Sequence, residues 1–296
     1  MKKPNFLIVG AAKSGTTSLF HYLKQHPEVF MPDLKEPQFL VCEKIKGRLH
    51  KYIDSAAEYY ELFEKSTEKC AGEASVFYLY YFEEAIKNIK KELGSDVKII
   101  IVLREPVSRA ISAYEHVLRN NPKEKLSFKE ALLQEGKRLE LEPDLTPMTL
   151  YKSMSMYSDA VAAYQNAFAN VHVVLYDEFL ANTEKSVHSI FNFLDISIPR
   201  NLDFSNKYNA GGWQWENEKL KQFALQEGVL KSIIRSLTPR SFRKKAYELF
   251  KSKASQHQKI EIDASLKKEL QLCFLEDIKK LEKLLNRNLK NWYEVA

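Results

Sequence analysis

The chain alternates short apolar runs with stretches in which apolar residues recur every three or four positions. Three runs, at 6–9, 97–103 and 171–176, are apolar without alternation and too short for ordinary helices, so they predict buried parallel strands. The periodic stretches predict amphipathic helices. The clearest of them cover 83–93, 106–120, 177–194 and 266–285. Strands that alternate with helices in this way indicate an α/β fold with a central, mainly parallel sheet flanked by helices.

The first strand leads into a loop of the kind that binds phosphate. Gly10 and Gly15 enclose small residues and one lysine, Lys13, and a helical pattern follows. A strand, a glycine-bearing loop and a helix N-terminus direct backbone N–H groups and the helix dipole at an anion, which predicts a P-loop-like three-layer fold. In nucleoside triphosphatases a lysine directly follows the second glycine. Thr16 and Thr17 stand there instead, which argues against a site for ATP and Mg²⁺ of that type.

A second candidate anion site follows the strand at 97–103. Arg104 stands at the carboxyl end of this strand, and Pro106 suits the first turn of the next helix. Ser108 and Ser112 are four residues apart and therefore share a face of that helix. An arginine beside two hydroxyls is a good anion receptor. Since both candidate sites follow parallel-strand patterns, we expect them to lie side by side.

Both segments resemble the donor-binding motifs of sulfotransferases that use 3′-phosphoadenosine 5′-phosphosulfate (PAPS), in particular a bacterial branch similar to the heparan-sulfate-type enzymes. GAAKSGTT resembles the 5′-phosphosulfate loop, often written PKSGTT, with Ala12 in place of proline. LREPVSRAISAY resembles the 3′-phosphate motif, in which Arg109 more often has a structural role. The resemblance implies that PAPS is bound by Ala12, Lys13, Ser14, Gly15, Thr16, Thr17, Ser18, Arg104 and Ser112.

The resemblance also implies an acceptor side of the site. A Lys-Glu-Pro segment like that of the family contains Glu36, which would be the general base for the acceptor hydroxyl. Gln38, Glu73 and Ser75 are weaker candidates for acceptor binding, and Ala74 stands where some branches have a lysine. Without the resemblance, the favoured interpretation of Glu36 is a surface ion pair with the neighbouring Lys35.

Two later segments have less specific patterns. The stretch 207–213 is basic, glycine-bearing and aromatic, and it is the candidate for the loop that sulfotransferases place over the nucleotide. Lys207 and Trp213 are therefore expected at the cofactor, although surface packing is equally open for Trp213. Most of the excess positive charge lies between 231 and 259. This segment predicts a solvated pair of amphipathic helices, with a docking surface for an anionic acceptor or lipid headgroups as the alternative.

Length and composition limit which of these interpretations are possible. The chain has 296 residues, 45% of them hydrophobic, and a formal net charge of +6, which suits an anionic ligand but not a dedicated nucleic-acid binder. Three scattered cysteines favour a reducing compartment over a disulfide framework or a zinc site. No apolar run approaches the roughly 20 residues of a membrane span, and no secretory signal is present. We therefore expect a cytoplasmic protein that needs no metal.

The most consistent function is the transfer of a sulfuryl group from PAPS to an acceptor hydroxyl, which gives adenosine 3′,5′-bisphosphate (PAP). Lys13 would stabilise charge on the leaving phosphate and Glu36 would take the proton. The alternatives are a nucleotide kinase or NTPase, and a non-catalytic nucleotide-binding protein. We expect one domain over 1–296, with an acceptor-side insertion around 120–150 and a helical C-terminal part at 216–296. The sequence leaves open the oligomeric state and whether the acceptor, possibly anionic, is a glycan, a lipid or a small natural product.

Overall fold

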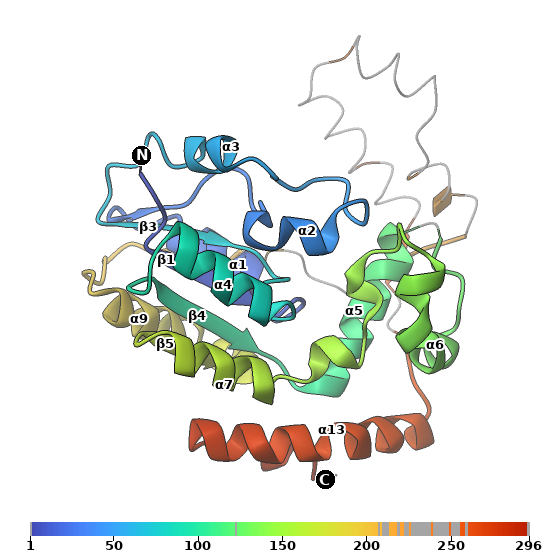
Figure 1. The fold of residues 1–296 in the computed structure, drawn as a ribbon. Helices are drawn as coiled ribbons and strands as arrows, with labels where there is room; N and C mark the ends of the chain where they lie inside the picture. The colour runs from blue at the N-terminus through green and yellow to red at the C-terminus, as the bar shows by residue number, and fades with distance from the viewer. Residues whose placement is uncertain are drawn as a thin grey trace.

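A five-stranded parallel sheet forms the centre of the computed structural model (Figure 1). The order of its strands is β2-β3-β1-β4-β5, so the first strand lies in the middle. The strands are β1 Phe6–Gly10, β2 Val29–Phe30, β3 Cys70–Ala74, β4 Lys98–Leu103 and β5 Val171–Leu175. This arrangement confirms the predicted parallel sheet. The short edge strand β2 was not predicted, because two residues carry no periodic signal.

The structure describes residues 2–121, 123–206, 208, 213–217, 220, 221, 225, 238, 249, 255–257 and 260–294. The helices in this part of the chain are α1 Thr16–Leu23, α2 Cys42–Ile45, α3 Ala56–Glu61, α4 Phe82–Glu92, α5 Pro106–Asn120, α6 Phe128–Leu141, α7 Ser158–Ala167, α8 Tyr176–Ala181, α9 Thr183–Leu194 and α13 Ala264–Leu285. Short 3₁₀ helices are η1 Phe39–Val41, η2 Pro147–Thr149, η3 Ser153–Ser155 and η4 Lys290–Trp292. A second, antiparallel sheet pairs β6 Trp213–Trp215 with β7 Ser255–His257.

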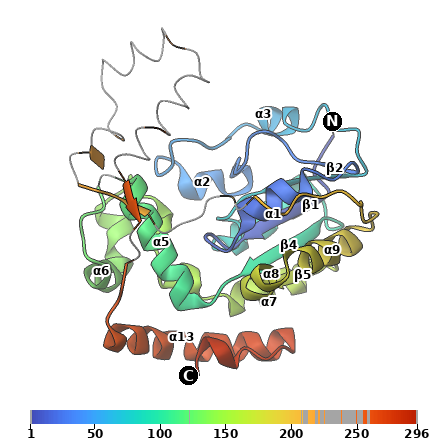
Figure 2. The ribbon, with the colours of Figure 1, turned by 180° about the vertical axis from the view of Figure 1, so that it is seen from behind.

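Helices cover both faces of the central sheet, which makes the three predicted layers. Successive residues of a strand point to opposite faces. Leu7 and Ile99 pack in the same apolar cluster as α4 and α7, which lie over one face in Figure 1. Phe6 and Ile100 pack with α1 and α9, which lie over the other face in Figure 2. Burial on both sides explains why these strands are apolar without alternation.

Helix α5 is fixed where it begins, at the end of β4. Glu105 caps it by accepting hydrogen bonds from the N–H groups of Val107 and Ser108, at 2.8 and 2.7 Å. Pro106 occupies the first turn, as predicted. The helix then extends beyond the sheet toward α6, and α13 packs against both α5 and α7 (Figure 1). The Arg-Glu-Pro sequence therefore sets the direction in which the chain leaves the strand.

One predicted helix is divided in two. The periodic stretch 177–194 forms α8 and α9, because Asn182 breaks the first helix and its side chain accepts the N–H of Lys185 at 2.9 Å, which caps the second. The expected insertion at 120–150 contains α6 and η2. Of the predicted helical part 216–296, α13 is helical and β7 is a strand, whereas most of the basic stretch 231–259 lies outside the described residues. The domain boundaries stay a prediction.

Within the described ranges, no helix combines the length and the apolar character needed to cross a membrane. The cysteines are free thiols, with Cys70 buried, Cys42 half-buried and Cys273 exposed. None of the three takes part in a disulfide in this structure.

Two glycines give a matched test of the packing. A Cβ atom on Gly72, in β3, would lie 2.2 Å from the Phe6 ring, whereas a Cβ atom on Gly136, in α6, would meet nothing within 4 Å. Gly72→Ala should lower the free energy of unfolding by about 1–3 kcal/mol, because the core cannot accept the methyl group without strain. Gly136→Ala should raise it by about 0.5–1 kcal/mol, because alanine is the better helix former. Chemical denaturation measures both, and equal effects would contradict the packing described.

Candidate active site

A cleft of about 710 Å³ lies at the carboxyl ends of β1 and β4. It brings together nine of the predicted site residues: Ala12, Lys13, Gly15, Thr16, Thr17, Ser18, Glu36, Arg104 and Ser112. The remaining lining residues are Tyr22, Val76, Ser108, Ile111, Glu115, His116, Met148, Tyr176, Phe179, Leu180, Thr183, Phe204, Tyr208 and Ile260. Ligand sites of open parallel sheets lie at this edge. The two predicted anion motifs therefore share one cavity.

The first motif ends in an uncapped helix. Gly15 is the N-cap residue of α1 and has φ +85°, a left-handed conformation that favours glycine. A Cβ atom there would also lie 2.8 Å from the ring of Tyr176. The helix has neither a side-chain cap nor an acidic residue in its first turn. Helices α2, α4, α7 and α8 also lack a side-chain cap, but each has an acidic residue in its first turn. Among the described α-helices, α1 alone has neither, so its N-terminus is left open to an anion.

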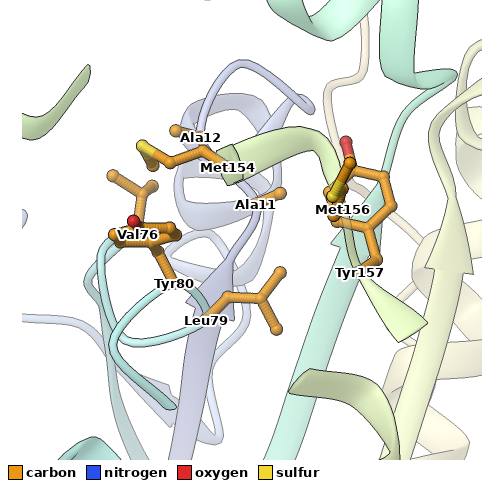
Figure 3. A pocket seen from close by; sticks show the side chains of 8 residues that line it. All are labelled: Ala11, Ala12, Val76, Leu79, Tyr80, Met154, Met156 and Tyr157. Atoms are coloured by element: carbon orange, nitrogen blue, oxygen red, sulfur yellow. The ribbon is translucent and has the colours of Figure 1, made fainter. Parts of the chain in front are cut away.

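The inner side of the same loop is packed against apolar side chains. Ala11 and Ala12 line a small niche of about 10 Å³ together with Leu79, Met154 and Tyr157 (Figure 3). Such a volume holds about one water molecule. These apolar side chains pack on the side of the loop that faces away from the cleft and so hold its backbone in place.

Lys13 lies in a strongly cationic environment. Its Nζ is 3.3 Å from Nδ1 of His116, which accepts the hydrogen bond. Burial, and after it the guanidinium of Arg119, lowers the pKa of Lys13 to about 8, while Glu36 acts in the opposite direction. Burial and the charge of Lys13 lower the pKa of His116 to about 3, so this imidazole is neutral at physiological pH. His116 follows Ser112 by one helical turn, and that spacing was the signal that could have revealed it.

Arg104 connects the second motif to the first. Its Nη1 donates to the carbonyl oxygen of Lys13 at 3.1 Å, and its guanidinium lies 5.0 Å from the centre of the Tyr176 ring. Tyr157 donates to the carbonyl oxygen of Arg104 at 3.0 Å. Arg109 lies elsewhere, fully buried, where it donates to Ser155 and to the Tyr151 carbonyl oxygen at 2.6 Å each. It thus has the structural role that the sequence suggested.

Glu36 lies in the cleft and is also half of an ion pair. Lys35 donates to its Oε1 at 2.5 Å. The backbone of Glu36 has φ +64°, and its N–H donates to the carbonyl oxygen of Ala74 at 3.1 Å. Glu36 therefore both forms the ion pair with Lys35 and lines the cleft. The Glu36 carboxylate is close enough to Lys13 to affect the pKa of that lysine.

The other predicted acceptor residues do not line this cleft. Gln38, Glu73 and Ser75 are buried beside it, at 1%, 1% and 0% exposure. Ser75 Oγ accepts the N–H of Gln38 at 3.0 Å and donates to Glu73 at 2.7 Å. Ser14 is buried as well, and its hydroxyl has no partner within the described part of the chain. These four side chains are near the site without lining the cleft.

The late aromatic segment is only partly described. Lys207 lies outside the described residues. Trp213 packs on Arg119, whose guanidinium lies 5.5 Å from its ring and donates to its carbonyl oxygen at 3.2 Å. Tyr208, which the sequence analysis missed, lines the cleft and stacks on His21 with ring centres 4.1 Å apart. Its position directly after Lys207 was the available signal.

The parallel sheet and the two anion motifs in one cleft are the features in which the sequence resembles the sulfotransferases. Residues 3–282 match the model of the sulfotransferase domain. The chain therefore belongs to the sulfotransferase family. In the described residues, no group of three or more His, Cys, Asp and Glu side chains is placed to hold a metal ion.

Individual relatives agree with this assignment. The crystal structure of a sulfotransferase from Alicyclobacillus acidocaldarius has 29% identity and a TM-score of 0.74, covering 99% of this chain and 100% of that one. The membrane-associated sulfotransferase kil1 of Dictyostelium discoideum is 29% identical over 143 residues, 46% of this chain and 29% of the relative. Human heparan sulfate glucosamine 3-O-sulfotransferase 5 is 23% identical over 212 residues, 70% of this chain and 57% of the relative. The chain thus spans less than two thirds of the length of these two relatives.

The environment of Lys13 generates a direct prediction. In the unliganded protein, Lys13 should titrate with a pKa of about 8 rather than near 10.5, because burial and the neighbouring guanidiniums disfavour the charged form. Saturating inorganic pyrophosphate should raise this pKa, since an anion favours the ammonium. NMR of ¹³C-methylated lysines measures the titration, and Lys13→Arg assigns the resonance. A pKa near 10.5 without ligand would contradict the structure.

Proposed function

We propose that this chain transfers a sulfuryl group from PAPS to an acceptor hydroxyl and releases PAP. The observation that carries the proposal is the meeting of Lys13, Arg104 and the uncapped N-terminus of α1 with Glu36 in one cleft. Three sources of positive potential suit a donor with a phosphosulfate and a further phosphate. The carboxylate beside them suits the removal of a proton from an acceptor.

The residues present fit the donor. A Cβ atom on Gly15 would lie 2.8 Å from the Tyr176 ring, so the turn requires glycine, and the Ser14 hydroxyl is buried without a partner among the described residues. Residues 12–18 would hold the 5′-phosphosulfate, and Arg104 with Ser112 the 3′-phosphate. The cleft is also lined by Tyr22, Phe179, Phe204 and Tyr208. Aromatic rings of this kind suit the adenine base.

Each group in the proposed transfer has a defined task. The acceptor oxygen forms a bond to sulfur while the bond between sulfur and the bridging oxygen of the 5′-phosphosulfate breaks. Glu36 takes the proton of the acceptor hydroxyl, and Lys13 stabilises the charge that develops on the departing phosphate. Positioning and electrostatics supply most of the rate enhancement in such a scheme. Lys13, with a pKa of about 8, carries its charge at neutral pH.

The acceptor, compartment and metal requirement extend this proposal. We propose a hydroxylated acceptor, with a glycan as first candidate because one relative is named a heparan sulfate glucosamine 3-O-sulfotransferase. A lipid and a small natural product are the alternatives. Three free thiols support a reducing, cytoplasmic compartment. The scheme needs no metal and no nucleic acid.

Two substitutions test the assigned roles. Lys13→Ala and Glu36→Gln should each lower kcat by about 10²-fold or more, because each removes a group that acts in the transition state. Glu36→Gln should leave the Kd for PAP nearly unchanged, since this residue is not assigned to the donor. Steady-state rates and calorimetry give the two quantities. Near-normal turnover by Glu36→Gln would remove it from the role of base.

Donor choice tests the function as a whole. Calorimetry should show binding of PAP without Mg²⁺, and ATP with Mg²⁺ should bind more weakly, because no lysine follows Gly15 as in an NTPase. A mass-shift screen with PAPS and libraries of glycans and metabolites should then yield sulfonated products. Tight binding of ATP with Mg²⁺ and none of PAP would favour the kinase alternative. Binding of PAP without any transfer product would favour the non-catalytic one.

A further inference from the structure

A carboxylate lies in the interior, on a strand whose other residues are small and apolar. Glu73 is the fourth residue of β3, whose other members are Cys70, Ala71, Gly72 and Ala74. It is 1% exposed and pairs in register with Leu7 of β1. No ion pair is recorded for it in the described part of the chain. A buried carboxylate is costly unless its oxygens are hydrogen-bonded, so its presence calls for a physical reason.

Three hydroxyl groups satisfy this carboxylate. Ser75 donates to its Oε2 at 2.7 Å, while Tyr78 and Tyr59 donate to its Oε1 at 2.7 and 3.2 Å. Burial raises the pKa of Glu73 to about 7, and the three hydrogen bonds act against that rise. The carboxylate is thus an acceptor that fixes the direction of three O–H bonds. Once these hydroxyls donate to Glu73, their own lone pairs are directed elsewhere.

Two of the hydroxyls use those lone pairs on the segment that follows Glu36. Ser75 Oγ accepts the N–H of Gln38 at 3.0 Å, and the Tyr78 hydroxyl accepts the N–H of Leu40 at 3.3 Å. The backbone is left-handed at Gln38 as well as at Glu36, with φ +55° and +64°. Residues other than glycine hold that conformation only with support from their surroundings.

We infer that Glu73 is a positioning residue for Glu36, acting through the hydroxyls of Ser75 and Tyr78, which hold the segment 36–40 against the end of β3. Glu73 lies outside the cleft and touches neither donor nor acceptor there. This inference rests on the proposed function, because it gives Glu36 the task of base. It replaces the expectation that Glu73 and Ser75 bind the acceptor directly. Displacement of a reacting group by about 1 Å can cost ~10²-fold in rate.

The two tyrosines provide matched variants. Both are fully buried and both donate to the same oxygen of Glu73, but only the hydroxyl of Tyr78 also accepts an N–H from the segment. Tyr59 touches this segment through its ring, which stacks on Phe39 at 4.5 Å and is kept in a phenylalanine variant. Tyr78→Phe should therefore speed amide hydrogen exchange at Leu40 by ~10-fold, and Tyr59→Phe by less than about twofold. Equal exchange in the two variants would overturn the inference.

A rate measurement separates positioning from simple stability. The probe is PAPS alone, with water as the acceptor, followed as PAP released in a single turnover. Glu73→Gln and Tyr78→Phe should slow release by ~10-fold or more while the Kd for PAP changes less than about twofold, because the phosphate loop is untouched. Tyr59→Phe should slow the release of PAP by a smaller factor, although it removes a hydrogen bond from the same carboxylate. A common loss in rate and affinity for all three variants would indicate a structural role only.

The final comparison uses Glu36→Gln as the background. If Glu73 acts through Glu36, then adding Tyr78→Phe to Glu36→Gln should lower the rate of PAP release by less than about a further twofold. A full additional loss would show that Tyr78 acts by another route and would overturn the inference. If the unmodified chain binds PAP but releases none from PAPS, the proposed transfer fails instead. In that case, the exchange rates at Leu40 alone decide whether the segment is held by this network.

Discussion

The site depends on a group of positively charged side chains that are partly buried and lie close together. Lys13 and Arg104 both line the cleft, and Arg119 lies near enough to depress the pKa of Lys13. Such charges repel one another, and among the described residues of the lining only Glu36 and Glu115 carry the opposite sign. The sheet nevertheless fixes them in place, because Arg104 follows β4 directly and bonds to the carbonyl oxygen of Lys13. An anion in the cleft relieves this repulsion, so the folded chain is prepared for one before it binds.

The same arrangement explains why His116 stays neutral. A histidine between two cations gains nothing from a proton, and its Nδ1 instead accepts a hydrogen bond from Lys13. The lysine is therefore oriented while its charge remains available. Glu36 approaches from the opposite segment of chain and raises the pKa of Lys13, so this carboxylate favours the charged form of the lysine. The charge of Lys13 is therefore set by both the cations and the carboxylate around it.

That the two anion motifs share one cleft could be predicted from the sequence, because their signals are local. A strand, a glycine turn and a helix start lie within residues 6–23, and Arg104 directly follows the next central strand. The contacts of Trp213 and Glu73 could not be predicted in this way. Trp213 meets Arg119 across 94 residues of sequence, and Glu73 meets Tyr59 from a different element. Neither contact leaves a periodic trace, so the sequence left ligand binding and packing equally open for Trp213 and made Glu73 a weaker candidate for acceptor binding.

The two halves of the site are supported by different kinds of structure. The donor half stands on strand ends and helix starts, whose geometry is set by backbone hydrogen bonds of the central sheet. Glu36, the proposed base, belongs to an irregular segment whose left-handed residues are held by side chains in the interior. Irregular segments accept sequence change more readily than a sheet does. If Glu36 is the base that we propose, a buried anchor would keep its position constant, because the surface around it is the part of the chain most free to vary.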